Sequence, residues 1–448
     1  NSIMSKIEVD AIDKQSGSTL TLGGSGTAVT LGAGATQSGF GRTGTVDWQT
    51  SIKTSGFTAV SGEGYFCNTT SGGFTVTLPS SPSVGDIVAV KDYASTFNSG
   101  NLTLGRNSSN IEGLASNKIL AIAGLSITFV YGDATKGWLA INDMTSDVSP
   151  KFVTATGGTI TTVCTNFKVH TFTGPGTFTV TCAGNACGSN KVDYLVVAGG
   201  GGGGTGGGGA GGYRESPGTA SGCYSVSPLG AAPAVALPVS VQGYPIAVGG
   251  GGTLGQNCNT AGTPGAVSTF STITSAGGGG GKVYNQSSPD SGNGGSGGGG
   301  ALTGPHRPAG SGNTPPVSPA QGKDGAAGDS STPGKGGGGG GATAAATFGP
   351  GAGGAGATSS INGTPTARAG GGGAGGFGTP EPGGPGGAGG GGAGGDGSTG
   401  APGDAGTAGT VNTGGGGGGA GYYPGAPGNT INAGAGGSGI VIIRYKFQ

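Results

Sequence analysis

The sequence predicts an all-β protein with no α-helical domain, in which a β-sheet base carries a bundle of glycine-rich extended helices. Glycine makes up 116 of the 448 residues, and 89 of these glycines follow position 198. Strand-like segments flank this glycine-rich body at residues 191–198 and 440–447. β-Branched and aromatic residues dominate both segments, and turn residues bound them. Runs of four or more glycines recur between them, at 199–204, 206–209, 249–252, 277–281, 297–300, 336–341, 370–373, 389–392 and 414–419.

The glycine runs exclude several ordinary structures. Glycine weakens both an α-helix and a sheet and offers no side chain to pack. A collagen triple helix needs glycine at every third position. Residues 322–328 fit that period, whereas residues 315–319 and 343–348 break it.

Two interpretations of the glycine-rich body remain. It is either a flexible linker, or a set of polyglycine II helices, extended and with three residues per turn, that pack side by side and exchange backbone hydrogen bonds. Residues 199–439 contain only thirteen charged side chains. Because disordered segments are usually charged, this composition favours the packed bundle.

The closing strand-like segment has two faces. The odd-numbered residues from Val441 to Phe447 share one face, and the even-numbered residues from Ile440 to Lys446 share the other. We expect this segment to pair with residues 191–198 in one sheet. The glycine-rich body, residues 199–435, is then an excursion fixed at both ends. Further strands of the base, which comprises residues 149–198 and 436–448, are expected at 151–155, 166–172 and 176–182.

Three motifs resemble the glycine-rich domain of bacteriophage tail-fibre and tail-tip adhesins. They are residues 172–180 (FTGPGTFTV), 192–204 (VDYLVVAGGGGGG) and 436–445 (GGSGIVIIRY). The resemblance covers about residues 165–448, although the interior is similar only in composition. It implies a polyglycine-helix body whose connecting loops contact the host surface. It implies no catalytic residues.

The N-terminal segment, residues 1–53, contains few large apolar side chains. Leu20 and Leu22 are echoed nine residues later by Val29 and Leu31, with glycines between the two pairs. So little apolar mass cannot form a monomeric core. We therefore expect a fibrous, trimeric shaft or connector, with Trp48 at its junction with the next domain.

Residues 54–148 are expected to form an all-β, sandwich-like or barrel-like domain, because short strand patterns alternate with turn clusters. Trp138 is expected in its core rather than as a platform for a ligand. Some of its segments, such as 64–70 and 74–79, resemble small β-domains of phage fibres. The strands are expected at 64–68, 74–78, 86–91, 101–104, 119–122, 126–131 and 137–142.

Composition gives no indication of catalysis or of a cofactor. The formal net charge is zero, which argues against nucleic acid as a partner. No apolar run approaches the length of a membrane span. The two histidines, His170 and His306, lack the spacing of zinc ligands. Their positions also do not indicate a base that activates a nucleophile. Turn and surface roles are expected for the carboxylates of the globular domain, Glu63, Asp86, Asp92, Glu112 and Asp133.

The six cysteines leave two alternatives open. They are either free thiols, or they form one or two disulfides, since a phage protein folds in a reducing cytoplasm and acts outside it. The candidates for disulfides are Cys182, Cys187, Cys223 and Cys258.

These observations predict a non-catalytic phage tail-fibre adhesin that binds a glycan or outer-membrane protein of the host. It would form a homotrimer, contact other virion tail proteins, and be made in the host cytoplasm. The alternative is a structural filament or shaft subunit without a receptor site; a polysaccharide-degrading tailspike would show β-helix repeats, which are not visible.

Aromatic and arginine residues in loops are the expected receptor contacts, or else they pack against the bundle. They are Tyr213, Arg214, Tyr224, Tyr284, His306, Arg307, Phe348, Arg368, Phe377, Tyr422 and Tyr423.

Overall fold

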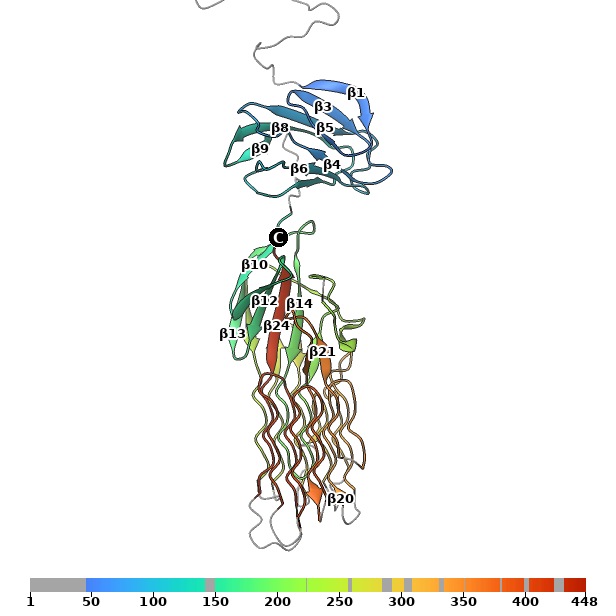
Figure 1. The fold of residues 1–448 in the computed structure, drawn as a ribbon, viewed down its shortest axis with the longest axis vertical. Coiled ribbons are helices and arrows are strands. Elements are labelled where there is room, and N and C mark those ends of the chain that lie inside the picture. The colour runs from blue at the N-terminus through green and yellow to red at the C-terminus, as the bar shows by residue number, and fades with distance from the viewer. Residues whose placement is uncertain are drawn as a thin grey trace, which may run out of the picture.

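A computed structural model gives the structure of the chain, and Figure 1 shows three parts in succession along the long axis. A β-sandwich comes first, a second set of sheets forms the base, and the glycine bundle extends from the base. The shaft expected at the N-terminus lies outside the described residues. The structure describes residues 46–141, 150–222, 224–256, 260–283, 292–301, 308–329, 334–349, 351–378, 381–398, 403–422 and 431–448.

The sandwich consists of two sheets with the strand orders β1-β3-β5-β8-β9 and β2-β4-β6-β7. Its core lies between them and includes Trp138, which is fully buried as expected. Strand β1 pairs with β3, so residues 47–53 belong to this sandwich and not to the shaft predicted over residues 1–53. The strands are β1 Asp47–Lys53, β2 Phe57–Thr58, β3 Glu63–Cys67, β4 Phe74–Thr77, β5 Ile87–Asp92, β6 Leu102–Gly105, β7 Lys118–Leu120, β8 Ser126–Asp133 and β9 Gly137–Ala140.

The carboxylates of the sandwich organise its turns. Asp92 is buried and accepts hydrogen bonds from the amides of Thr96, Phe97 and Gly124. Asp133 accepts from the amides two and three residues later in the β8–β9 turn. Backbone amides that lack a partner in a strand are satisfied in this way.

The base contains two sheets with the strand orders β10-β13-β17-β18-β19 and β11-β12-β24-β14-β15, with β16 paired to β14. The expected pairing of the two flanking strands is confirmed, because β14 and β24 are antiparallel neighbours. Strand β11, which pairs with β12, was not predicted. The elements are β10 Val153–Thr156, β11 Thr159–Val163, β12 Phe167–Phe172, β13 Gly176–Ala183, β14 Lys191–Val197, β15 Tyr213–Glu215, η1 Pro228–Gly230, β16 Leu237–Pro238, β17 Gly243–Ala247, β18 Ser268–Phe270, β19 Ile273–Ser275 and β24 Ile440–Lys446.

The sheet that contains β14 and β24 is buried on both faces. Val441, Ile443 and Tyr445 pack into the core between the two sheets, whereas Ile440 and Ile442 pack into a second core on the other side. This confirms the predicted division of the closing strand into two faces. A strand buried on both sides reads as a continuous apolar run, as β14 and β24 do. Two short sheets complete the described strands, with β20 Gly334–Lys335 beside β23 Gly376–Phe377 and β21 Ala357–Ser359 beside β22 Thr366–Arg368.

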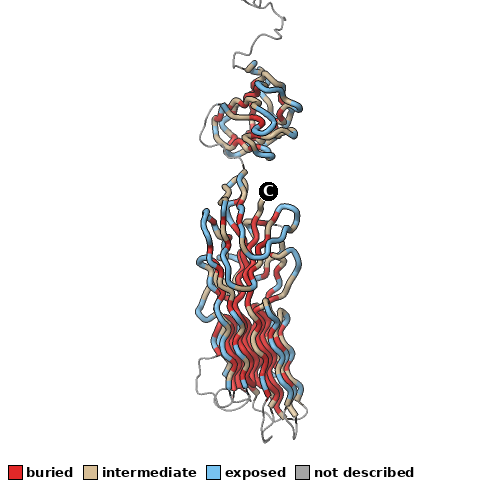
Figure 2. Tube along the Cα trace, turned by 90° about the vertical axis from the view of Figure 1, so that its left-hand side faces the viewer, coloured by how far each residue is buried: buried red, intermediate tan, exposed pale blue. Residues whose placement is uncertain are grey.

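The glycine runs form a packed bundle of extended helices, which Figure 2 shows as the largest buried region of the chain. In residues 199–204 every amide and every carbonyl is hydrogen-bonded to a neighbouring segment. Because the helix has three residues per turn, every third residue meets the same neighbour. The amides of Gly199 and Gly202 donate to Ala266 and Thr263, for example. Amides of this run donate to segments 263–266, 434–437 and 206–209, and its carbonyls accept from segments 278–281, 252–255 and 417–420.

The number of glycines in each triplet follows the depth of a segment in the bundle. The interior run 414–419 is glycine throughout and buried throughout. In residues 383–388 the pattern is Gly-Gly-Pro and Gly-Gly-Ala, and the third residue of each triplet is exposed. In residues 403–410 glycine occupies only every third position, and both residues between successive glycines are exposed. In these three segments, exposed side chains therefore stand on the side of the helix that has no neighbour.

Candidate functional site at the distal end of the glycine bundle

The bundle is a scaffold that excludes side chains from its interior. A Cβ atom on Gly416 would lie 1.9 Å from the Gly208 carbonyl oxygen, and one on Gly338 would lie 2.2 Å from the Ala352 carbonyl oxygen. Real Cβ atoms do not approach other atoms so closely. Segments packed this tightly cannot rearrange independently, so the bundle holds its ends in fixed relative positions.

The distal end, which is the end farther from the sheets, carries the described aromatic residues Phe377 and Tyr422. Strand β20, which pairs with β23, marks this end in Figure 1. The two rings stack with centroids 5.8 Å apart and planes at 15°. Phe377 is 8% exposed, and Tyr422 is partly exposed and packs against a small cluster that includes Ile431. The stack is therefore a fixed aromatic edge rather than a pair of free side chains.

A salt bridge lies beside this aromatic edge. Lys335 Nζ of β20 is 3.2 Å from a carboxylate oxygen of Glu381, and both side chains are partly exposed. The backbone of β20 pairs with that of β23, which contains Phe377. An ion pair in such a partly exposed setting adds little stability. Both charged groups remain close to water, where a ligand's polar groups can reach them.

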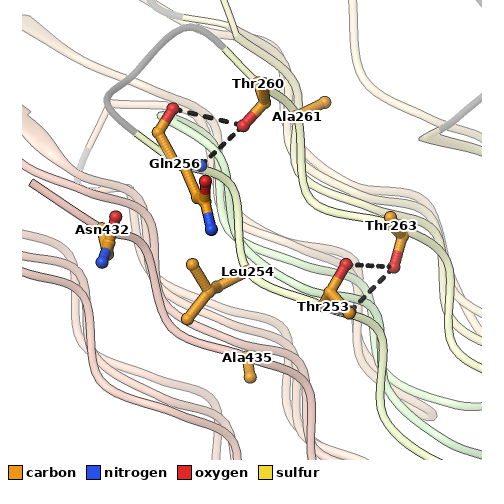
Figure 3. A pocket seen from close by; sticks show the side chains of 8 residues that line it. All are labelled: Thr253, Leu254, Gln256, Thr260, Ala261, Thr263, Asn432 and Ala435. Atoms are coloured by element: carbon orange, nitrogen blue, oxygen red, sulfur yellow. Dashed lines mark hydrogen bonds between the residues drawn. The ribbon is translucent and has the colours of Figure 1, made fainter.

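An open groove of about 620 Å³ runs along the side of the bundle. Figure 3 shows Leu254 projecting into it, with the side-chain amides of Gln256 and Asn432 nearby. One wall is fixed by hydrogen bonds between adjacent segments, because the Thr263 hydroxyl accepts from the Thr253 amide at 2.8 Å. Leu254 gives the groove an apolar floor, and the amide side chains of Gln256 and Asn432 give it polar sides. Sequence reasoning missed it, although Leu254 is the one large apolar residue within segment 249–256.

Several predicted contact residues lie in the base and not at the distal end. Tyr213 is in β15 and is 1% exposed, and Arg368 is in β22 and is 4% exposed. Neither side chain is presented to a receptor, because the hairpin of β21 and β22 packs on this side of the sheet and buries Tyr213 together with its own Arg368. Tyr213 and Arg368 therefore pack against the body of the protein, which was the alternative to receptor contact for these residues.

Tyr213 and Arg368 flank a buried carboxylate. Glu215 accepts hydrogen bonds from the Tyr213 hydroxyl, the Ser227 amide and the Ser359 hydroxyl. Burial raises the pKa of Glu215, and burial lowers the pKa of Arg368. The carboxylate connects β15 to the η1 segment and to β21, so this network fastens loops of the glycine-rich body to the base.

Tyr224 and Arg214 also lie by the base. The Tyr224 ring is 5.0 Å from the guanidinium carbon of the buried Arg444, and burial raises the pKa of its hydroxyl. Arg214 is the partly exposed middle residue of β15. Phe348 alone is widely exposed among the described candidates, at 60%. Tyr284, His306, Arg307 and Tyr423 lie outside the described residues.

Cys182 and Cys187 are free thiols, so the disulfide considered for them does not form. The Asn185 side chain accepts from the amides of Cys187, Gly188 and Lys151. These bonds turn the loop toward β10 instead of closing it on Cys182. Cys223 and Cys258 lie outside the described residues.

The described part of the chain holds no group of three or more histidine, cysteine, aspartate or glutamate side chains that could bind a metal ion. Within the same residues, no helix has the length and apolar character needed to cross a membrane. The features that remain for recognition are the aromatic edge, the neighbouring ion pair and the lateral groove.

The fold and the hydrogen-bonding pattern define an all-β protein built on a polyglycine-helix bundle. The sequence pattern of the glycine-rich domain family matches residues 172–446, which is more than half of the chain. The chain belongs to the glycine-rich domain family. No curated protein matches it.

Proposed function

We propose that this protein is a tail-fibre adhesin of a bacterial virus that binds a host cell-surface receptor through the distal end of its glycine bundle, without catalysis. The observation that carries the proposal is the bundle itself. It is long, hydrogen-bonded on every side in its interior, and fixed to the base through strands such as β14 and β24. Such a scaffold does not itself catalyse a reaction, but it holds surface side chains far from the rest of the chain.

The distal end supports a binding role through its chemistry. Phe377 and Tyr422 form a rigid stacked pair, and rigid aromatic residues give contact area at a low cost in conformational entropy. Lys335 and Glu381 lie next to them and offer groups of both charges. A glycan or a loop of an outer-membrane protein presents the matching combination of apolar faces and hydrogen-bonding groups.

Replacing Tyr422 by alanine tests this proposal. The parent protein, labelled with a fluorophore, is titrated onto cells of a panel of bacterial strains. On strains that it binds, Tyr422→Ala is expected to weaken binding by about tenfold or more, as is usual for an aromatic residue at the centre of a contact. Tyr93→Ala is the matched control, because Tyr93 is 54% exposed but lies on the β-sandwich.

Three outcomes oppose the proposal. If the parent binds no strain, or if Tyr422→Ala binds as well as the parent, there is no evidence for a distal receptor site. Equal losses in both variants indicate contact through the whole surface. Imaging of the native assembly separates an adhesin from a filament, since an end-to-end polymer of this chain is the expected result only for a filament.

A further inference from the structure

The lateral groove around Leu254 follows the line where two extended segments of the bundle meet. Residues 249–256 form one wall, and residues 431–438 form the other. Backbone hydrogen bonds join the two walls, since the Ala433 amide donates to the Gly255 carbonyl at 3.0 Å. Both segments are thus fixed in the bundle on one side and are open toward the groove, as Figure 3 shows.

The backbone of both walls presents unpaired polar groups. Among the described residues no hydrogen-bond partner is found for the amides of Gly251, Leu254 and Ala435 or for the carbonyls of Gly251, Leu254 and Gly436. These four residues are partly exposed. In residues 199–204, by contrast, every amide and carbonyl is bonded. The groove therefore has the hydrogen-bonding groups of a position in the bundle that one further helix would fill.

Residues 383–388 show how a helix is held at the edge of this bundle. The Gly384 amide donates to the Ala374 carbonyl at 2.8 Å. Pro385 is exposed, and its carbonyl accepts from the Gly353 amide at 2.9 Å. Glycine permits the close approach of two backbones, whereas proline lacks an amide hydrogen and favours the extended conformation. A Gly-Gly-Pro triplet is thus suited to a position at the edge.

Gly250 is a second feature of the groove that indicates the approach of another backbone. It precedes Thr253, which lines the groove, by one turn of the helix. Gly250 is exposed, and a Cβ atom there would meet nothing within 4 Å. In residues 383–388 the exposed third positions carry proline and alanine instead. The chain itself does not require glycine at position 250, but a helix that packs against this wall does.

We propose that the groove binds a glycine- and proline-rich segment of a partner protein, which adds to the bundle as one further extended helix. Such a segment repeats every three residues, or about 9 Å, which matches the spacing of the unpaired groups at Gly251 and Leu254. The Leu254 side chain gives a proline ring an apolar contact, and the Gln256 and Asn432 amides lie beside it. In the same way, peptides add to the free edge of a sheet through backbone hydrogen bonds.

The test titrates the full-length chain onto a fluorescein-labelled peptide of repeated Gly-Gly-Pro triplets and follows fluorescence anisotropy. This peptide is expected to bind. A peptide of repeated Val-Gly-Pro triplets is expected to bind at least about tenfold more weakly, because its Cβ atoms keep the two backbones apart. Amide hydrogen exchange, measured by NMR, is expected to slow at Leu254 and Ala435 when the first peptide is bound, since their amides then have acceptors.

Three variants of the full-length chain place the peptide in the groove. Ala435→Leu fills the groove and is expected to weaken binding of the Gly-Gly-Pro peptide by about tenfold or more. Leu254→Ser removes the apolar floor and should weaken it as well. Ala388→Leu is the matched control, because Ala388 is exposed on a different helix of the bundle, and it should bind the peptide like the parent. Melting temperatures establish that each variant is folded.

The proposal is overturned if the parent does not bind the Gly-Gly-Pro peptide, or if it binds both peptides equally. Equal binding by Ala435→Leu and Ala388→Leu also overturns it, as does unchanged exchange at Leu254 and Ala435 in the presence of the bound peptide. A lower oligomeric mass of Ala435→Leu in light scattering would assign the groove to a second copy of the chain instead.

Discussion

A single methyl group decides whether a residue fits into the glycine bundle. Around Gly416 the nearest atoms are backbone atoms of Gly208 and Gly372, which cannot move without breaking their own hydrogen bonds. Gly250 lies in the same bundle, but a Cβ atom there would meet nothing within 4 Å. Glycine is therefore required at position 416 for steric reasons. At position 250 the structure shows no such requirement.

Alanine substitution at these two positions is the corresponding prediction. Gly416→Ala is expected to lower the free energy of unfolding by about 2–4 kcal/mol, since the bundle must open and leave backbone groups unpaired. Gly250→Ala should be neutral or stabilising by up to about 1 kcal/mol, because it restricts the unfolded chain. Thermal and denaturant unfolding measure both. Equal stabilities of the two variants would contradict the steric account.

At the scale of elements, His170 joins β12 to β24 and to the turn before β11. Its Nδ1 is 2.7 Å from the Gly157 carbonyl oxygen, which can only accept, so Nδ1 carries the proton. Its Nε2 then accepts from the Tyr445 hydroxyl at 3.0 Å. The imidazole is fully buried, and burial lowers its pKa below the ordinary value of 6.5. A neutral ring is thus part of the contact between these strands.

The pH dependence of stability follows from this geometry. The pKa of His170 in the folded state lies below that in the unfolded state, so the unfolded chain binds the proton first. The stabilising contribution is present above about pH 6.5 and is lost as the pH falls from there through the lowered folded pKa. Melting temperatures measured from pH 7 to pH 4 should fall less steeply for His170→Gln than for the parent. An unchanged slope in His170→Gln would contradict the assignment.

At the scale of the whole molecule, oligomer contacts are expected in the N-terminal segment that precedes the sandwich. Its sparse apolar residues at positions such as Leu20 and Leu22 suit a structure in which several chains wrap together.

Light scattering of the full chain and of a variant that lacks residues 1–37 tests this expectation. The full chain is predicted to be a trimer, and the shortened chain a folded monomer. Circular dichroism and melting temperature establish that the shortened chain is folded. A full chain that stays monomeric at micromolar concentration would rule out the trimeric shaft, and a shortened chain that stays trimeric would place the contacts in the sandwich or the base.

The sequence by itself determined the fold class, the strands β3 to β10, β12 to β14 and β24, and the glycine composition of the bundle. Alternation in β24 assigned its two faces, because the period of side chains in a strand is fixed. Glycine triplets distinguish interior from peripheral helices, since only a residue without Cβ fits against a neighbour on that side. These properties are local, and each can be read from a few adjacent residues.

The tertiary structure alone decided which residues come together. Tyr213 and Arg368 were predicted as loop contacts, but both are buried. The β21–β22 hairpin, which contains Arg368, packs over Tyr213 and Glu215 and is more than a hundred residues away from them in the sequence. The stacked pair of Phe377 and Tyr422 and the groove around Leu254 likewise depend on which helices are neighbours. Glycine runs of nearly identical composition do not encode that order. It appears in the contacts between distant segments, such as the hydrogen bonds that join residues 199–204 to segments 263–266 and 434–437.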